Sequence, residues 1–149
     1  MEPYIWVHFY FPKGLIGHIS SWCGHSRFGH VTFEIGPGAL YEIPICGKTR
    51  WIPAWKYKQL RPPDRTLQIK APFAEEFSND TQGLIHWKHE WFKTVLNFLK
   101  GKPPVNSKNC LTATLVALEA CMGRPLDSTV ETVDDLYIAL LKGGFMVWY

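Results

Sequence analysis

Cys110 is the side chain of this sequence best suited to nucleophilic chemistry. It stands at or beside the start of a predicted helix over 109–122. The free N–H groups and partial positive charge of a helix N-terminus favour the thiolate form, so the pKa of such a cysteine falls and its nucleophilicity rises. The same N–H groups can bind the oxyanion that forms when sulfur attacks a carbonyl. The alternative is a small packed residue, since free cysteines are among the most buried side chains.

A cysteine nucleophile needs a base within hydrogen-bonding reach, and His30 is the best placed of the 6 histidines. It stands near the start of a predicted strand over 28–35, in which alternate residues face opposite sides. A strand at this place would hold the imidazole ring on a rigid element. The alternative is a partly buried strand histidine that pairs with a backbone group.

A catalytic histidine also needs a third group that fixes its tautomer. Glu42 follows His30 by about a dozen positions, on the returning strand predicted over 39–45. A tight turn rich in glycine and proline would bring the two residues close to one another. Glu34 and Thr32 share the face of His30 and compete for this role, and Glu42 could instead be a solvated strand carboxylate.

The elements that must position these side chains are strands in the first half of the chain and helices in the second. The predicted strands cover 4–11, 28–35, 39–45 and 65–71, and the predicted helices cover 81–99, 109–122 and 131–141. Irregular segments are expected over 20–29 and 51–64, and 145–149 form either a last strand or a packed tail. Strands followed by helices predict an α+β fold, with a small antiparallel sheet packed against C-terminal helices.

Length and composition bound the class of protein. The chain has 149 residues, of which 46% are hydrophobic and 19% charged, so we expect a single domain over 1–149 with its own core. A net charge of +3 does not indicate nucleic-acid binding without a clustered basic patch. No apolar run approaches the roughly 20 residues of a membrane span, and the first residues do not read as a signal peptide. With 4 cysteines and no CxxC pair, a cytoplasmic protein with free thiols is expected.

Three segments together resemble the circularly permuted papain-like fold of the NlpC superfamily. They are FGHVTFEI over 28–35, ALYEI over 39–43 and NCLTA over 109–113. In that family a histidine on an early strand, a polar residue on the next strand and a cysteine at a later helix start follow in this order, which reverses that of ordinary papain-like enzymes. The branch includes lecithin:retinol acyltransferase-like enzymes and bacterial YiiX-like hydrolases. The resemblance covers roughly 4–122.

The chain departs from one branch of that family. Lecithin:retinol acyltransferase-like members usually carry a second histidine where Glu42 stands, and an aromatic residue after the cysteine where this chain has Ala113 and Thr114. We also expect no counterpart of their C-terminal hydrophobic anchor within 109–149, which reads as an ordinary amphipathic stretch. The glutamate is closer to the YiiX-like group, so the resemblance carries over the three site residues better than any particular substrate.

The resemblance implies a cysteine hydrolase, either an amidase or peptidase or an acyl hydrolase, that works through an acyl-enzyme intermediate. Cys110 would attack an amide or acyl-ester carbonyl, His30 would move the proton, and Glu42 would orient the imidazole. Such a site needs no cofactor and no metal. The expected partner is a peptide, amide or acyl-ester substrate, and an acyltransferase, in which an acceptor other than water resolves the intermediate, stays open.

Two other classes compete with this prediction. A non-catalytic binding module on the same fold could use the surplus of aromatic residues, which make up 15% of the chain. A zinc domain could use Cys23, His25, His30 and Cys46, since cysteine and histidine are zinc ligands, although their spacing matches no common zinc pattern. Reactivity of the Cys110 thiol and metal analysis separate the three classes.

Overall fold

The computed structural model describes residues 4–23, 26–35, 38–43, 50–79, 90–102, 107–126, 129–142 and 146–148. Their strands form one antiparallel sheet in the order β4-β3-β2-β1-β5-β6. The strands are β1 (Tyr4–Tyr10), β2 (His30–Ile35), β3 (Ala39–Glu42), β4 (Arg50–Pro53), β5 (Arg65–Lys70) and β6 (Met146–Trp148). The predicted α+β class is confirmed, and of the two alternatives for 145–149 the structure has a strand, β6.

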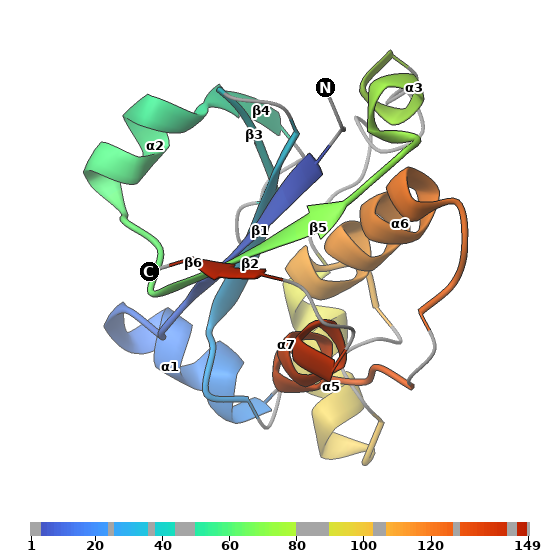
Figure 1. Cartoon of the computed structure of the whole chain (residues 1–149). Helices are drawn as coiled ribbons and strands as arrows, with labels where there is room; N and C mark the ends of the chain where they lie inside the picture. Colours follow the sequence, from blue (N-terminus) through green and yellow to red (C-terminus); the bar gives the residue numbers. More distant parts are fainter. Residues whose placement is uncertain are drawn as a thin grey trace.

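The helices are α1 (Gly14–Cys23), α2 (Ala54–Leu60), α3 (Ala74–Asn79), α5 (Trp91–Leu99), α6 (Cys110–Met122) and α7 (Val133–Lys142). Figure 1 shows α3, α6 and α7 on one side of the sheet and α2 on the other. The predicted helices over 109–122 and 131–141 are confirmed as α6 and α7. Of the helix predicted over 81–99, residues 91–99 form α5, and 81–89 lie outside the described residues.

Two segments predicted as irregular contain regular structure, which corrects that part of the prediction. Residues 20–23 complete α1, and 51–60 contain most of β4 and all of α2. Helices this short are marginal alone and depend on tertiary contacts. In α2, Ala54 and Tyr57 are buried in a cluster with Tyr10 and Leu40. Because those partners are distant in sequence, the local pattern could not predict the helix.

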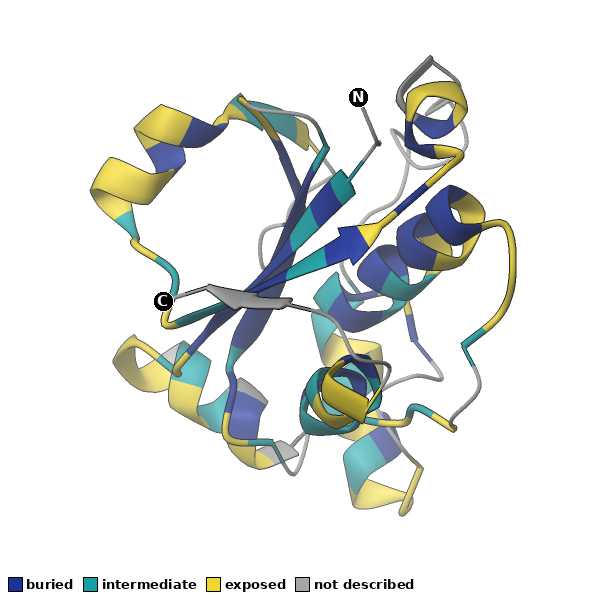
Figure 2. Ribbon diagram, viewed as in Figure 1, coloured by how far each residue is buried: buried dark blue, intermediate teal, exposed yellow. Residues whose placement is uncertain are grey.

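The two faces of the sheet carry different side chains. On β1, the side chains of Ile5, Val7 and Phe9 lie in the apolar core together with residues of α3, α6 and α7. The alternate residues His8 and Tyr10 point to the opposite face, beneath α2. Figure 2 shows β1 and β2 buried along most of their length. Polar side chains on the α2 face are therefore buried and need partners inside the protein.

Helix α6 has well-defined ends, and its start places Cys110. The side chain of Asn109 accepts hydrogen bonds from the backbone N–H groups of Leu111 and Thr112, and the Thr112 hydroxyl accepts one from the backbone of Asn109. This reciprocal capping fixes Cys110 as the first helical residue. The helix ends at Gly123 with φ 74°, a left-handed conformation that favours glycine.

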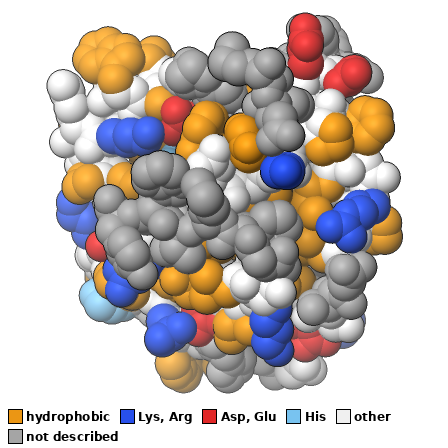
Figure 3. Space-filling view, viewed as in Figure 1, with side chains coloured by type: hydrophobic (Ala, Val, Ile, Leu, Met, Phe, Trp, Pro, Cys, Tyr) orange, Lys and Arg blue, Asp and Glu red, His pale blue; other side chains and the backbone are white. Residues whose placement is uncertain are grey.

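The surface seen in Figure 3 mixes residue types. On that face the Lys and Arg side chains are spread among apolar and acidic ones. The described residues therefore present no concentrated basic surface there for a nucleic-acid backbone. Across the described part of the chain, no helix has both the length and the apolar content that crossing a bilayer requires.

Candidate active site

The fold brings Cys110, His30 and Glu42 together. Nε2 of His30 lies 3.4 Å from Oε2 of Glu42, and the Cys110 thiol lies near enough to the His30 ring for each group to shift the pKa of the other. The three residues begin α6, begin β2 and end β3, respectively. A thiol, an imidazole and a carboxylate thus lie together, although Glu42 and Cys110 are 68 positions apart in the sequence.

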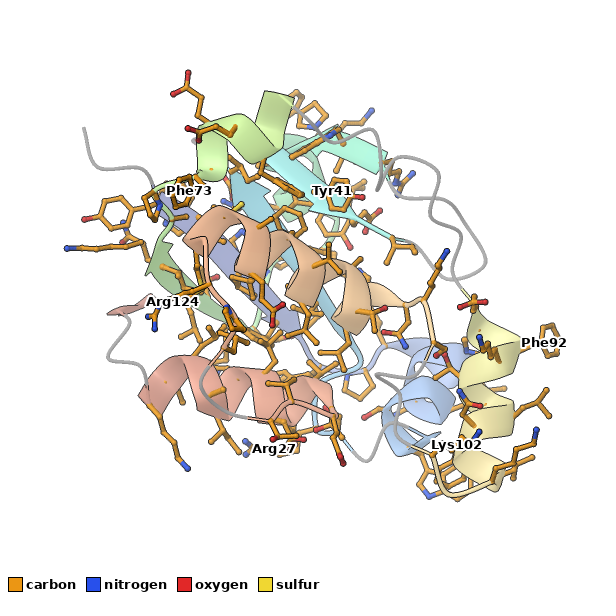
Figure 4. The ribbon with its side chains drawn as sticks, turned by 90° about the vertical axis from the view of Figure 1, so that its right-hand side faces the viewer. Arg27, Tyr41, Phe73, Phe92, Lys102 and Arg124 are labelled. Carbon is orange, nitrogen blue, oxygen red and sulfur yellow. The ribbon has the colours of Figure 1, made fainter. Side chains whose placement is uncertain are left out.

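Strand register explains how Glu42 reaches His30. Phe33 pairs with Tyr41 across β2 and β3, so Glu42 lies beside Thr32 and diagonally across from His30. Diagonal neighbours on one sheet face are within reach of long side chains. Helix α6 packs across the sheet, with its apolar face on the core that contains β2 (Figure 4), and so delivers Cys110 from a third element.

The three candidates for the orienting group have different partners in the structure. Glu42 contacts His30, as described above. Glu34 instead makes a hydrogen bond with His8, and the Thr32 hydroxyl hydrogen-bonds the hydroxyl of Tyr10. All three residues share one face of the sheet, so periodicity alone could not separate them. The structure places Glu42, and neither competitor, against the imidazole.

Cys110 and His30 shift each other's pKa toward a thiolate–imidazolium pair. Burial alone would raise the pKa of the Cys110 thiol, but the hydrogen bond and positive charge of His30 outweigh burial and lower it. Hydrogen bonds from the backbone of Val31 and Leu111 lower it further. Burial would lower the pKa of His30, but Cys110 and then Glu42 outweigh that effect and raise this pKa to about 9. Both shifts favour the charged forms, a thiolate and an imidazolium.

Glu42 is held by more than the imidazole. Its Oε1 accepts hydrogen bonds from Nε of Arg50 at 2.8 Å and from Nη2 at 2.5 Å, and Tyr57 of α2 lies near enough to the same carboxylate to affect its pKa. Burial would raise the pKa of Glu42, but His30, followed by Arg50 and Tyr57, lowers it to about 2. The sequence did not suggest Arg50 or Tyr57, although Arg50 pairs with Glu42 across β3 and β4.

Access to the site is unequal among its members. His30 is 7% exposed and Glu42 is 3% exposed, whereas Cys110 is partly exposed. The ring of Tyr10 packs 5.6 Å from that of His30 and shields it. The strand enters the site through Gly29, where any Cβ would lie 2.8 Å from the Pro12 Cα, so a side chain there would displace the backbone. Of the three residues, Cys110 is therefore the one with the most exposed surface.

A second buried histidine–glutamate pair lies on the same sheet face, and the sequence analysis missed it. Nε2 of His8 lies 2.9 Å from Oε1 of Glu34, Nδ1 lies 2.9 Å from the Thr66 hydroxyl, and Lys58 Nζ lies 2.9 Å from Glu34 Oε1. Burial would raise the pKa of Glu34, but His8 and Lys58 lower it to about 2. Burial lowers the pKa of His8 despite the glutamate. The signal available in the sequence was strand alternation, which places these side chains on one face of the sheet.

The zinc alternative falls largely outside the described residues. His25, Cys46 and the side chain of Cys23 are not among them. The ring of His30 contacts Glu42 and Cys110. Within the described part of the chain, no group of three or more His, Cys, Asp or Glu side chains is arranged to hold a metal ion.

The case for this site therefore comes from geometry and local electrostatics. Three side chains with the chemistry of a thiol-dependent acyl-transfer site converge, and a second layer of partners holds the carboxylate. Comparison with family models, curated proteins and solved structures gives no match to this chain.

Proposed function

We propose that this chain is a cysteine hydrolase that cleaves amide or acyl-ester bonds through an acyl-enzyme intermediate. The observation that carries the proposal is the closeness of the Cys110 thiol, at the capped N-terminus of α6, to the His30 ring, which lowers the pKa of the thiol and raises that of the imidazole. A lowered thiol pKa beside a raised imidazole pKa is the arrangement that a thiolate nucleophile and its acid–base partner require.

The first half of the proposed reaction forms a thioester. The Glu42 carboxylate accepts the Nε2 proton of His30, so Nδ1 is the nitrogen that receives the Cys110 proton. The thiolate attacks the carbonyl carbon, a C–S bond forms, and the carbonyl electron pair moves to oxygen. The backbone N–H of Cys110 contributes to stabilising this oxyanion. When the intermediate collapses, the C–N or C–O bond breaks and His30 gives its proton to the leaving group.

The second half releases the acyl group. His30, now neutral, takes a proton from a water molecule as that water attacks the thioester carbonyl. Collapse breaks the C–S bond, and the product leaves as a carboxylic acid. The thiolate and imidazolium are then restored, so no cofactor or external redox agent enters the cycle.

One feature of the sequence and one of the structure support a place for the chain in the permuted papain-like group. The first is the order histidine, carboxylate, cysteine along the chain. The second is the location of these residues on two adjacent strands and a following helix start. The same features support peptide, amide and acyl-ester substrates equally, so the proposal ends at this substrate class.

An activity-based probe tests the proposal without knowledge of the substrate. Folded protein is treated with a vinyl-sulfone or activated acyl probe, and the modified residue is located by mass spectrometry. We expect modification at Cys110, with strong loss in His30→Ala. Cys121 is the internal control, because it is buried and burial raises its pKa to about 12. Labelling of Cys110 no faster than a free peptide thiol would reject the catalytic proposal in favour of a binding module.

A further inference from the structure

We propose that Arg50 is a positioning residue that holds the Glu42 carboxylate ionised and turned toward His30. The contact between Nε2 of His30 and Oε2 of Glu42 is long, at 3.4 Å. The contacts between Arg50 and the other carboxylate oxygen are shorter, at 2.8 Å and 2.5 Å. The shorter contacts with the Arg50 guanidinium therefore fix the orientation of the Glu42 carboxylate more firmly than the longer contact with the His30 imidazole does.

The chemistry of Arg50 suits this task. Its guanidinium is planar and permanently charged, and it donates from two nitrogens to Oε1 of Glu42, which leaves Oε2 to face the ring. Glu42 itself is buried, and burial favours its protonated form, which the positive charges of His30 and Arg50 together oppose. Protonated Glu42 would no longer favour the imidazolium form of His30.

The place of Arg50 in the fold makes the idea testable. It is the first residue of β4, an edge strand, and its side chain is 54% exposed. Its strand partner is Glu42. Substitution there leaves the apolar core unchanged, since that core is built from other residues.

The second buried pair supplies a matched control. Lys58 is also half-exposed, at 41%, and also lends a positive charge to a buried glutamate that contacts a histidine. Its partner, however, is Glu34 and not Glu42. Lys58→Gln therefore removes the same kind of interaction from the same face of the sheet without touching the carboxylate that faces His30.

The inference rests on the proposed function for its effect on turnover, but its main measurement needs no substrate. The pKa of the His30 imidazole is read by NMR titration of the full chain, with the signal assigned by its loss in His30→Gln. We expect Arg50→Gln to lower this pKa by about one unit and to move the acid limb of Cys110 alkylation to higher pH. Arg50→Lys keeps the positive charge but cannot donate from two nitrogens of one planar group. It should therefore lower the pKa of His30 by a smaller amount.

Specific outcomes would overturn the inference. One is a His30 pKa in Arg50→Gln that equals the wild-type value or exceeds it, which would mean that the Arg50 charge only opposes the imidazolium. Another is an equal shift in Lys58→Gln. If Arg50→Gln does not fold, as judged by circular dichroism, the Arg50→Lys titration decides the question. The two proposals can fail separately. If the probe does not label Cys110 in the wild-type protein, but Arg50→Gln still lowers the pKa of His30, the hydrolase proposal is rejected and the role of Arg50 stands.

Discussion

Nε2 of His30 faces Oε2 of Glu42 at 3.4 Å, and this contact decides which ring nitrogen serves the thiol. A carboxylate only accepts hydrogen bonds, so Nε2 carries a proton in both charge states of the ring. Nδ1 is then the nitrogen that gains and loses the proton exchanged with Cys110. The predictions below follow from this assignment and from the partners around it.

Cys110→Ala is expected to reduce turnover of any amide or ester substrate by at least about 10³-fold, because no other group supplies the nucleophile. The fold should survive, since Cys110 is partly exposed and the capping residues of α6 remain. Turnover and thermal unfolding are measured on the same preparation. Cys110→Ser is the matched control of similar size. A Cys110→Ala protein with wild-type turnover would show that the chemistry lies elsewhere.

The pH dependence of Cys110 alkylation should differ from that of an ordinary thiol. The pKa of Cys110 is lowered and that of His30 is raised to about 9, so the thiolate forms at a lower pH than it does in an ordinary thiol. The rate with iodoacetamide should therefore change little across neutral pH, whereas the rate for a peptide thiol rises as pH approaches about 8.5. Rates are followed by mass spectrometry from about pH 5 to about pH 9. A Cys110 profile that overlays the peptide profile would contradict the ion pair.

Glu42→Gln is expected to damage turnover less than His30→Ala, by about 10- to 100-fold. An amide can still orient the ring, but it carries no charge to support the imidazolium. The pKa of His30 should fall, and the high-pH limb of kcat should move below about 9. The pH profile of kcat measures this shift. If Glu42→Gln keeps full activity and an unchanged profile, Glu42 is not the orienting group.

Glu34 should make stability depend on pH under acidic conditions. Its pKa is lowered to about 2 in the folded protein, so its contribution is present above about 4.3, the unfolded value, and is lost as pH falls toward 2. His8, whose pKa is also lowered, likewise loses its contribution as pH falls below about 6.5. Both effects make the folded protein less stable in acid.

Glu34→Gln is the variant that isolates this effect. At neutral pH it should lower the free energy of unfolding by about 2–3 kcal/mol, below the cost of breaking a fully buried pair because Lys58 stays half-exposed. The difference from wild type should shrink as pH falls through the range of the Glu34 carboxyl. Urea unfolding at several pH values measures it. A difference that is the same at every pH would argue for lost packing instead of lost charge.

Asn109→Ala should lower the free energy of unfolding by about 1–2 kcal/mol, since it removes the side chain that accepts from two N–H groups at the start of α6. Asn109→Ser, which keeps an acceptor at the cap, should recover most of this loss. Chemical denaturation of the three proteins gives the values. Equal losses in both variants would show that other contacts of Asn109, such as the one with Ser107, dominate.

The sequence by itself determined where Cys110 would sit. A helix start depends on residues within a few positions of it, so Asn109, Cys110 and the terminal Gly123 identified α6 without tertiary information. Local sequence also predicted the alternation of β2 and the hairpin that leads from β2 to Glu42 on β3. These features follow from backbone hydrogen bonding and side-chain period, which neighbouring residues control.

Only the tertiary structure decided which carboxylate meets His30 and what holds it. Glu42, Glu34 and Thr32 share one face, and the pairing of β2 with β1 and β3, together with the packing of α2, gave each a different partner. Arg50 and Tyr57 converge on Glu42 from separate elements. Burial and partner charges that set the pKa of a side chain come from contacts between distant segments, so local sequence could not supply them.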